Sequence, residues 1–198
     1  MMWKMVEFHK FNNNVNFENE EILIVGTFPA REELWDFEFF YSSKKNKLWD
    51  ILQEIFNENF KFKEEQEAVK ERKKFLKDKN LAMIDIIEEC VRTKQKPSSD
   101  NNLKIIALRD IYSILKNNKK IKRVILTSRT GKNGVLSLLK KELDENYLQN
   151  NKIELKFKNF DRNIFEFKEL KPIEITKEAY LKKAVIHIKN ENRKIDIS

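Results

Sequence analysis

Small and polar residues that could do chemistry stand directly after three short apolar runs of the chain. These runs cover residues 21–26, 81–87 and 123–127, and their length and β-branched residues are typical of buried parallel strands. The turns that follow are residues 26–30, the stretch that begins at Asp85, and residues 128–134. In an open α/β sheet the ligand crevice lies beyond the carboxyl ends of the strands, so we expect these turns to form one site.

The segments between these runs predict the elements that hold the turns in place. Helices are predicted from apolar spacing or charge-rich composition over residues 48–56, 63–78, 103–115 and 135–147, the second of them exposed. Residues 153–157 and 164–170 alternate as half-exposed strands do, and Thr176 can cap a last helix to about residue 183. We therefore expect one α/β domain over residues 1–198, a three-layer α/β/α sandwich with a central, mainly parallel four-stranded sheet.

The composition excludes several classes of protein. With 198 residues, 40% of them hydrophobic and 15 of them Phe, the chain can bury a core and is not expected to be disordered. No apolar run is long enough to span a bilayer, and residues 1–10 lack the apolar stretch of a signal peptide. We therefore expect a cytoplasmic protein that does not contact a membrane.

Cysteine and histidine usage limits the catalytic devices that the chain can hold. Cys90 is the only cysteine, which excludes an internal disulfide and leaves no basis for a cysteine metal site. The carboxylates show no metal-ligand spacing, so neither a metal nor a cofactor is expected. His9 and His187 lie near opposite ends of the chain, so a Ser-His-Asp or Cys-His device is not expected.

Positive charge is concentrated in the second half of the chain. The net charge is +8, with −3 in residues 1–100 and +11 in residues 101–198. This asymmetry predicts a polyanionic partner that touches mainly the C-terminal half. A solvated surface in a Lys-rich proteome is the alternative explanation.

Two segments together resemble the uracil-DNA glycosylase superfamily, in its hypoxanthine-DNA glycosylase and mismatch-specific branches. Residues 22–52 (ILIVGTFPAREELWDFEFFYSSKKNKLWDIL) resemble its first motif, and residues 81–103 (LAMIDIIEECVRTKQKPSSDNNL) resemble its strand that ends in Asp before a Ser-Asp loop. Residues 124–129 (VILTSR) are similar to the strand with a small polar turn. The matching residues are Gly26, Thr27, Pro29, Ala30, Tyr41, Asn46, Trp49, Asp85, Cys90, Arg92, Ser99 and Asp100. The final Ser/His-Pro-Ser-Pro loop of the family has only Lys171 and Pro172 as a counterpart.

The resemblance implies a monomeric, monofunctional DNA glycosylase, a hydrolase of base-excision DNA repair that needs no cofactor. Such enzymes flip a deaminated or modified base out of DNA and hydrolyse its N-glycosidic bond, and hypoxanthine and uracil are the first substrates to expect. By this resemblance Asn46 positions water, Tyr41 stacks on the base and Asp85 reads or polarises it. Further base contacts are expected from Gly26, Thr27, Phe28, Pro29, Ala30, Ser99 and Asp100. DNA contacts are expected from Ser128, Arg129, Lys132, Lys171 and Pro172.

Each of these residues also has an ordinary structural explanation. Asn46 and Asp85 can cap helices, Tyr41 can be a core aromatic, Ser99 and Asp100 can cap the segment after them, and residues 128–132 can be a solvated turn. Two other functions of the same fold stay open, a nucleic-acid-binding protein that has lost the chemistry and a glycosylase for hypermodified, phage-type bases. An α/β binding domain unrelated to DNA is a further alternative.

Overall fold

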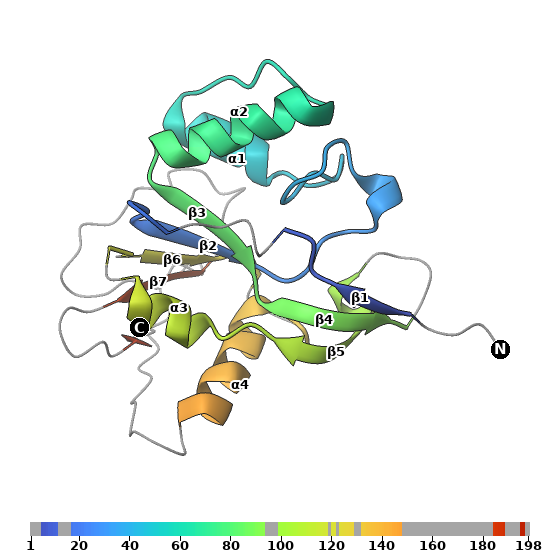
Figure 1. Ribbon diagram of the computed structural model, residues 1–198, viewed down its shortest axis with the longest axis vertical. Helices are drawn as coiled ribbons and strands as arrows, with labels where there is room; N and C mark the ends of the chain where they lie inside the picture. Colours follow the sequence, from blue (N-terminus) through green and yellow to red (C-terminus); the bar gives the residue numbers. More distant parts are fainter. Residues whose placement is uncertain are drawn as a thin grey trace.

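The computed structural model of the chain describes residues 5–11, 17–93, 99–118, 120–121, 123–128, 132–147, 184–188 and 195–196. Within these ranges the chain forms a five-stranded sheet, a three-stranded sheet and four α-helices (Figure 1). The expected strands at residues 153–157 and 164–170 and the expected helix from Thr176 lie outside the described residues. None of the described helices is long and apolar enough to cross a membrane.

The five-stranded sheet is built around β2 (Ile22–Gly26), which pairs in parallel with β3 (Leu81–Asp85) and β6 (Arg123–Leu126). The order is β3-β2-β6-β7-β8, and the last two strands, β7 (Ala184–Ile188) and β8 (Ile195–Asp196), run antiparallel to their neighbours. The register pairs Gly26 with Asp85, so β2 and β3 end side by side. Three of the predicted strands therefore form the parallel part of the sheet.

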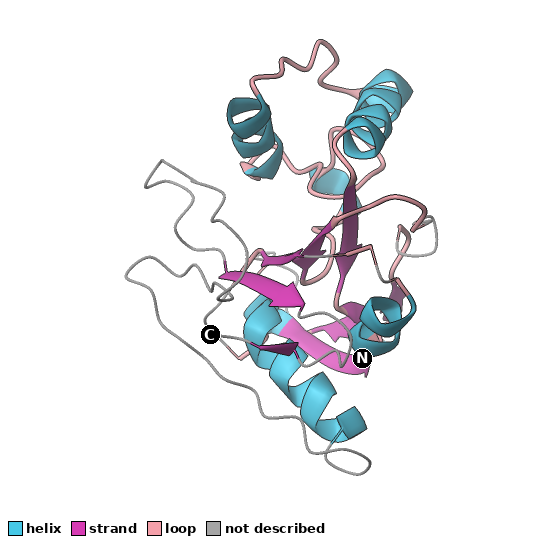
Figure 2. Ribbon diagram, turned by 90° about the vertical axis from the view of Figure 1, so that its left-hand side faces the viewer, coloured by secondary structure: helices cyan, strands magenta, loops and turns pink. Residues whose placement is uncertain are grey.

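Helices lie on both sides of this sheet (Figures 1 and 2). One side carries α1 (Leu48–Phe56) and α2 (Glu65–Asp78), and the other carries α3 (Ile111–Asn117) and α4 (Val135–Tyr147). Side chains of β2 alternate between two cores because successive strand residues point to opposite faces. Leu23 and Val25 join the core with α3 and α4, and Ile24 joins the core with α1 and α2. The predicted α/β class is confirmed.

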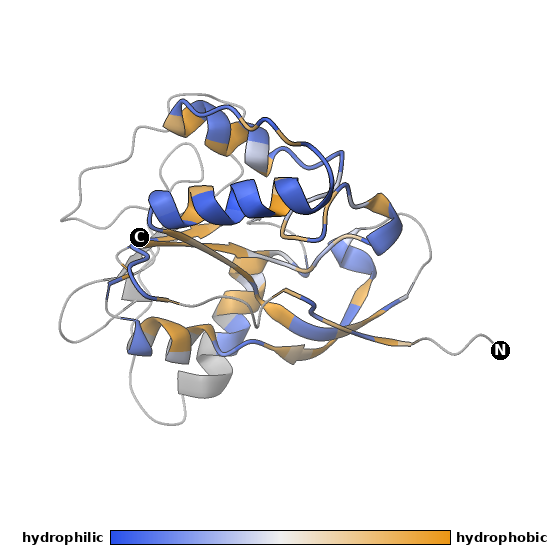
Figure 3. Ribbon diagram, turned by 45° about the horizontal axis from the view of Figure 1, so that its top comes forward, coloured by the Kyte–Doolittle hydropathy of each residue, from blue (hydrophilic) through white to orange (hydrophobic). Residues whose placement is uncertain are grey.

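The α2 helix is less exposed than its charge-rich sequence predicts. Figure 3 shows it mostly hydrophilic beside the hydrophobic strands of the sheet. Yet Ala68, Phe75 and Leu76 are buried against β3, and Arg72 is also buried. The Arg72 guanidinium lies 4.3 Å from the centre of the Phe60 ring, which explains how a charged residue is accommodated there.

A second sheet grows from the end of β3. Only Ile86 separates β3 from β4 (Ile87–Arg92), which pairs antiparallel with β1 (Val6–Phe8) and β5 (Leu103–Leu108). The predicted helix over residues 103–115 is therefore wrong in its first half. Pairing with β4 overrides the helical spacing there, and the helix begins only after Asp110, whose carboxylate accepts the Ser113 N–H at 2.8 Å.

Candidate active site

A cavity of about 470 Å³ opens at the carboxyl ends of β2, β3 and β6. It brings together most of the residues that the sequence analysis selected for a site. Its lining includes Thr27, Phe28, Pro29, Ala30, Tyr41, Asn46, Asp85, Asp100 and Ser128. The sequence assigned no role in a site to the other polar members of the lining, although Arg92 is one of the residues that carry the resemblance. These members are Ser42, Ser43, Lys45, Lys47, Arg92 and Thr127.

Gly26 ends β2 at the point where two cavity side chains come closest to the backbone. A Cβ at this position would lie 2.0 Å from Asp85 Oδ1 and 2.1 Å from Tyr41 Oη. Both distances are far below any van der Waals contact, so only glycine leaves room for the two groups. The role of Gly26 is therefore to admit Asp85 and Tyr41 to the same corner of the cavity.

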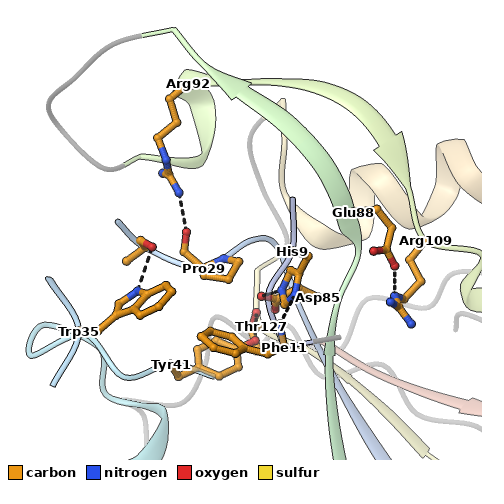
Figure 4. Close-up of polar contacts among 11 residues, drawn as sticks. His9, Phe11, Pro29, Trp35, Tyr41, Asp85, Glu88, Arg92, Arg109 and Thr127 are labelled. Atoms are coloured by element: carbon orange, nitrogen blue, oxygen red, sulfur yellow. Dashed lines mark hydrogen bonds and ion pairs between the residues drawn. The ribbon is translucent and has the colours of Figure 1, made fainter. Parts of the chain in front are cut away.

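Asp85 is held by a histidine that sequence analysis set aside. The side chain of Asp85 is buried, and its Oδ2 lies 2.8 Å from Nε2 of His9, which directly follows β1 (Figure 4). The Phe11 N–H donates to His9 Nδ1 at 3.1 Å. Because Nδ1 accepts a hydrogen bond, the ring proton is on Nε2, and a neutral His9 donates to Asp85.

Aromatic rings surround this His9–Asp85 pair. The His9 ring lies 5.5 Å from Phe28 and 5.7 Å from Phe40, measured between ring centres. His9 and Asp85 are 76 positions apart in the sequence, and no spacing rule joins residues so distant. The nearest available signal was His9 itself, a single histidine that stands between Phe8 and Phe11.

Tyr41 adopts a left-handed backbone conformation, with φ of 55°, that turns its side chain into the cavity wall. Its hydroxyl donates to Thr127 Oγ1 at 3.2 Å. Burial raises the pKa of Tyr41 well above its ordinary value, and the negative charge of Asp85 raises it further. Tyr41 is therefore a neutral phenol at physiological pH.

A second carboxyl group, that of Asp100, also faces the cavity. Asp100 begins a short 3-10 helix (Asp100–Asn102), and the hydroxyl of Thr27 donates to its carboxylate. Burial raises the pKa of Asp100, and the charge of Asp85 adds to this effect, while Arg92 opposes it. Ser99 Oγ accepts the Asn101 N–H at 3.3 Å, so Ser99 caps this turn and does not line the cavity.

The loop after β2 is held from two sides (Figure 4). Arg92 donates from Nη2 to the Pro29 carbonyl at 2.7 Å and from Nε to Glu7 Oε2 at 2.9 Å. Trp35 Nε1 donates to the Ala30 carbonyl at 2.9 Å. These bonds fix the backbone of Pro29 and Ala30 at the edge of the cavity, so this wall is formed before any ligand binds.

Asn46 both accepts a hydrogen bond at the start of α1 and lines the cavity. Its Oδ1 accepts the Leu48 N–H at 2.8 Å at the start of α1, so Asn46 caps this helix as its ordinary structural explanation predicts. Its side chain is exposed and lines the cavity. A carbonyl oxygen has two lone pairs, so Asn46 can also accept a hydrogen bond from water.

The turn after β6 is only partly described. Ser128 lines the cavity and its Oγ accepts the Val135 N–H at 2.9 Å, which caps α4. Lys132 is exposed and outside the cavity lining. Arg129, Lys171 and Pro172 lie outside the described residues.

Cys90 does not line this cavity. Cys90 is buried, and burial raises its pKa to about 11, so its thiol is a poor nucleophile at neutral pH. Among the residues that the structure describes, no group of three His, Cys, Asp or Glu side chains could hold a metal ion.

Comparisons of the chain with protein-family models, with curated proteins and with solved structures found no match. A function for this cavity has to be inferred from its own residues and from the motifs of residues 22–52 and 81–103.

Proposed function

We propose that this chain is a monofunctional DNA glycosylase of the uracil-DNA glycosylase superfamily, with the three-layer α/β/α sandwich of that family. It would hydrolyse the N-glycosidic bond of a deaminated or modified base. The observation that carries the proposal is the cavity, because Tyr41 and Asn46, from the segment before α1, line one space with Asp85 from the end of β3.

The size and position of the cavity suit a flipped base. Sites for small ligands commonly have volumes of about 300–1,000 Å³ and lie beyond the carboxyl ends of parallel strands. The cavity of about 470 Å³ falls in this range. Tyr41 supplies an aromatic ring on which any base can stack, and the exposed Lys45 and Lys47 at its lining can meet DNA phosphates.

The polar residues support a hydrolytic step. Water adds to C1′ of the sugar while the bond from C1′ to the base breaks, and positive charge develops on the sugar. Asn46 can orient this water through its Oδ1, and it is too weak a base to take the proton itself. The Asp85 carboxylate, oriented by His9, can accept a hydrogen bond from a base N–H or stabilise the positive sugar.

The proposal is tested by base release from labelled oligonucleotides. Duplexes and single strands that contain hypoxanthine, uracil, xanthine or only normal bases are incubated with the protein, and abasic sites are cleaved and counted. We expect release of at least one altered base and a loss of about 10²-fold in Asn46→Ala, the scale of effect when a reacting group is no longer correctly positioned. Release of no base from any oligonucleotide would contradict the proposal.

Asn117→Ala is the matched control, because Asn117 is an exposed asparagine of α3 that does not line the cavity. Its rate should equal that of the wild type. Asn46→Asp is a second control, for the effect of the helix cap on stability. Aspartate also accepts the Leu48 N–H and keeps α1 capped. If Asn46→Ala and the wild type release a base equally fast, Asn46 has only its capping role.

A non-catalytic nucleic-acid-binding protein is the second candidate. The observation that favours it is the hydrogen bond from the Leu48 N–H to Asn46 Oδ1 at the start of α1. A protein without catalytic activity would keep Asn46 for this stabilising bond alone. Salt-dependent DNA binding without release of any base is the result expected from this candidate.

A further inference from the structure

The inner end of the cavity carries negative charge. Asp85 and Asp100 both line the cavity, and the charge of Asp85 raises the pKa of Asp100, so the two carboxyl groups lie close enough to repel one another. Asp85 is only 4% exposed, so its charge is weakly screened by water.

Three cationic side chains are among the described residues that line the cavity, and two of them are engaged by other carboxylates. Arg92 also lines the cavity, but its Nε binds the Glu7 carboxylate at 2.9 Å. His9 is neutral, because its Nδ1 accepts the Phe11 N–H. The remaining lining cations, Lys45 and Lys47, are exposed, and Lys47 is ion-paired with Asp50 at 2.9 Å. The cavity is therefore acidic at its inner end and basic at its exposed side.

A second, independent feature points to a ligand with hydrogen-bonding groups. Ser42 lines the cavity and is only 4% exposed. Its hydroxyl has no hydrogen-bond partner among the residues that the structure describes. A buried hydroxyl without a partner is unfavourable, and a polar ligand in the cavity would supply one.

An acidic inner end favours one kind of leaving group over another. A neutral base such as uracil departs with a negative charge, and two nearby carboxylates oppose the growth of that charge. A base that carries a positive charge in DNA departs as a neutral molecule. Carboxylates attract such a base when it is flipped into the cavity, and they do not oppose its departure.

We propose that the cavity takes a purine that bears a positive charge through alkylation of a ring nitrogen, such as 7-methylguanine or 3-methyladenine. This inference rests on the proposed glycosylase function and names its substrate class. Water forms a bond to C1′ and the bond from C1′ to the purine nitrogen breaks. The electron pair of that bond neutralises the cationic ring, and the proton of the water passes to solvent. Asp85 and Asp100 bind the cation and accept hydrogen bonds from the N–H groups of the purine.

The test compares release of four bases by the full chain under single-turnover conditions. Duplex DNA methylated with dimethyl sulfate is assayed for free 7-methylguanine and 3-methyladenine by chromatography, and oligonucleotides with uracil or hypoxanthine are assayed in parallel. We expect at least tenfold faster release of one methylated purine than of uracil or hypoxanthine, after correction for spontaneous depurination. Asp100→Asn should lower release of the methylated purine at least tenfold. Asp78→Asn, a neutralised carboxylate at the exposed end of α2, should act as the wild type does.

The outcomes separate this inference from the function on which it rests. Faster release of uracil or hypoxanthine than of either methylated purine would overturn the inference and keep the glycosylase. Release of no base would overturn both. A binding measurement does not depend on folding of a variant: the wild-type protein should bind the cationic nucleoside 7-methylguanosine at least tenfold more tightly than guanosine, and equal binding would overturn the inference.

Discussion

Replacement of His9 by alanine removes two buried hydrogen bonds at once. The His9 Nε2–H donates to the Asp85 carboxylate at 2.8 Å, and His9 Nδ1 accepts the Phe11 N–H at 3.1 Å. His9 is 7% exposed and Asp85 is 4% exposed, so water replaces neither bond without rearrangement. The substitution leaves a buried carboxylate and a buried N–H without these partners.

The expected loss of stability follows from these two bonds. A hydrogen bond to a charged group contributes about 1.5–3 kcal/mol, and a buried N–H left without a partner costs about 1–3 kcal/mol. Together they predict that His9→Ala lowers the free energy of unfolding by roughly 3–5 kcal/mol, the range seen when one partner of a buried pair is removed. For a chain of this length that corresponds to a fall in melting temperature of roughly 6–20 °C.

Two conservative variants separate the bonds. Glutamine can place an N–H where Nε2 lies and keep the bond to Asp85, and asparagine can place an oxygen where Nδ1 lies and keep the bond to Phe11. Each should lose less stability than His9→Ala when unfolding in urea is followed by fluorescence. Lys10→Ala is the neighbouring control, because the contacts of Lys10 with Glu32 and with the Trp35 ring are made by a half-exposed side chain and should move the midpoint little. An unfolding midpoint of His9→Ala equal to that of the wild type would refute the role assigned to His9.

Three further predictions concern other residues of the cavity and the core. Gly26→Ala forces Asp85 and Tyr41 apart and should cost about 1–3 kcal/mol or more in urea unfolding, with loss of base release; a fully stable, active variant would contradict the close approach. Because the pKa of Asp100 is raised above 3.8, its stabilising contribution is present below pH 3.8 and is lost as pH rises through the raised value, so Asp100→Asn should gain stability over the wild type at pH 7 and little at pH 3.5. An equal difference at both pH values would contradict this. Cys90, buried with a pKa of about 11, should react with a disulfide reagent at pH 8 only after unfolding, and rapid reaction of the folded chain would contradict it.

The sequence predicts correctly those elements whose pattern of apolar residues fits only one kind of secondary structure. The run at residues 22–26 is apolar throughout and closed by Gly26, which fits a strand buried on both faces and little else. The helix from Leu48 to Phe56 carries its apolar residues on one side and is observed with the predicted bounds. Since parallel strands end at one edge of a sheet, the turns after β2, β3 and β6 could be expected to meet, and they line one cavity.

The errors and omissions have a common physical origin in contacts between distant segments. Residues 103–108 are helical by spacing and form a strand because β4 offers them a partner. The charge-rich α2 hides an inner face because Arg72 can bury its guanidinium against aromatic rings. His9 reaches Asp85 only because β1 pairs with β4, directly beyond the end of β3. Each of these contacts joins segments that no local pattern relates.

The consequence for function is that the charge environment of Asp85 is not set by its motif alone. Its position follows from the pairing of β3 with β2 opposite Gly26, which the motif contains. Its charge environment follows from His9, which precedes the motif, and from Asp100, which follows β4. A neutral His9 leaves the negative charge of Asp85 in place, whereas a cationic histidine would cancel it. The charge around Asp85 therefore depends on His9, which lies outside the recognisable pattern, as well as on Asp100, which lies within it, and we base the proposed substrate class on these charges.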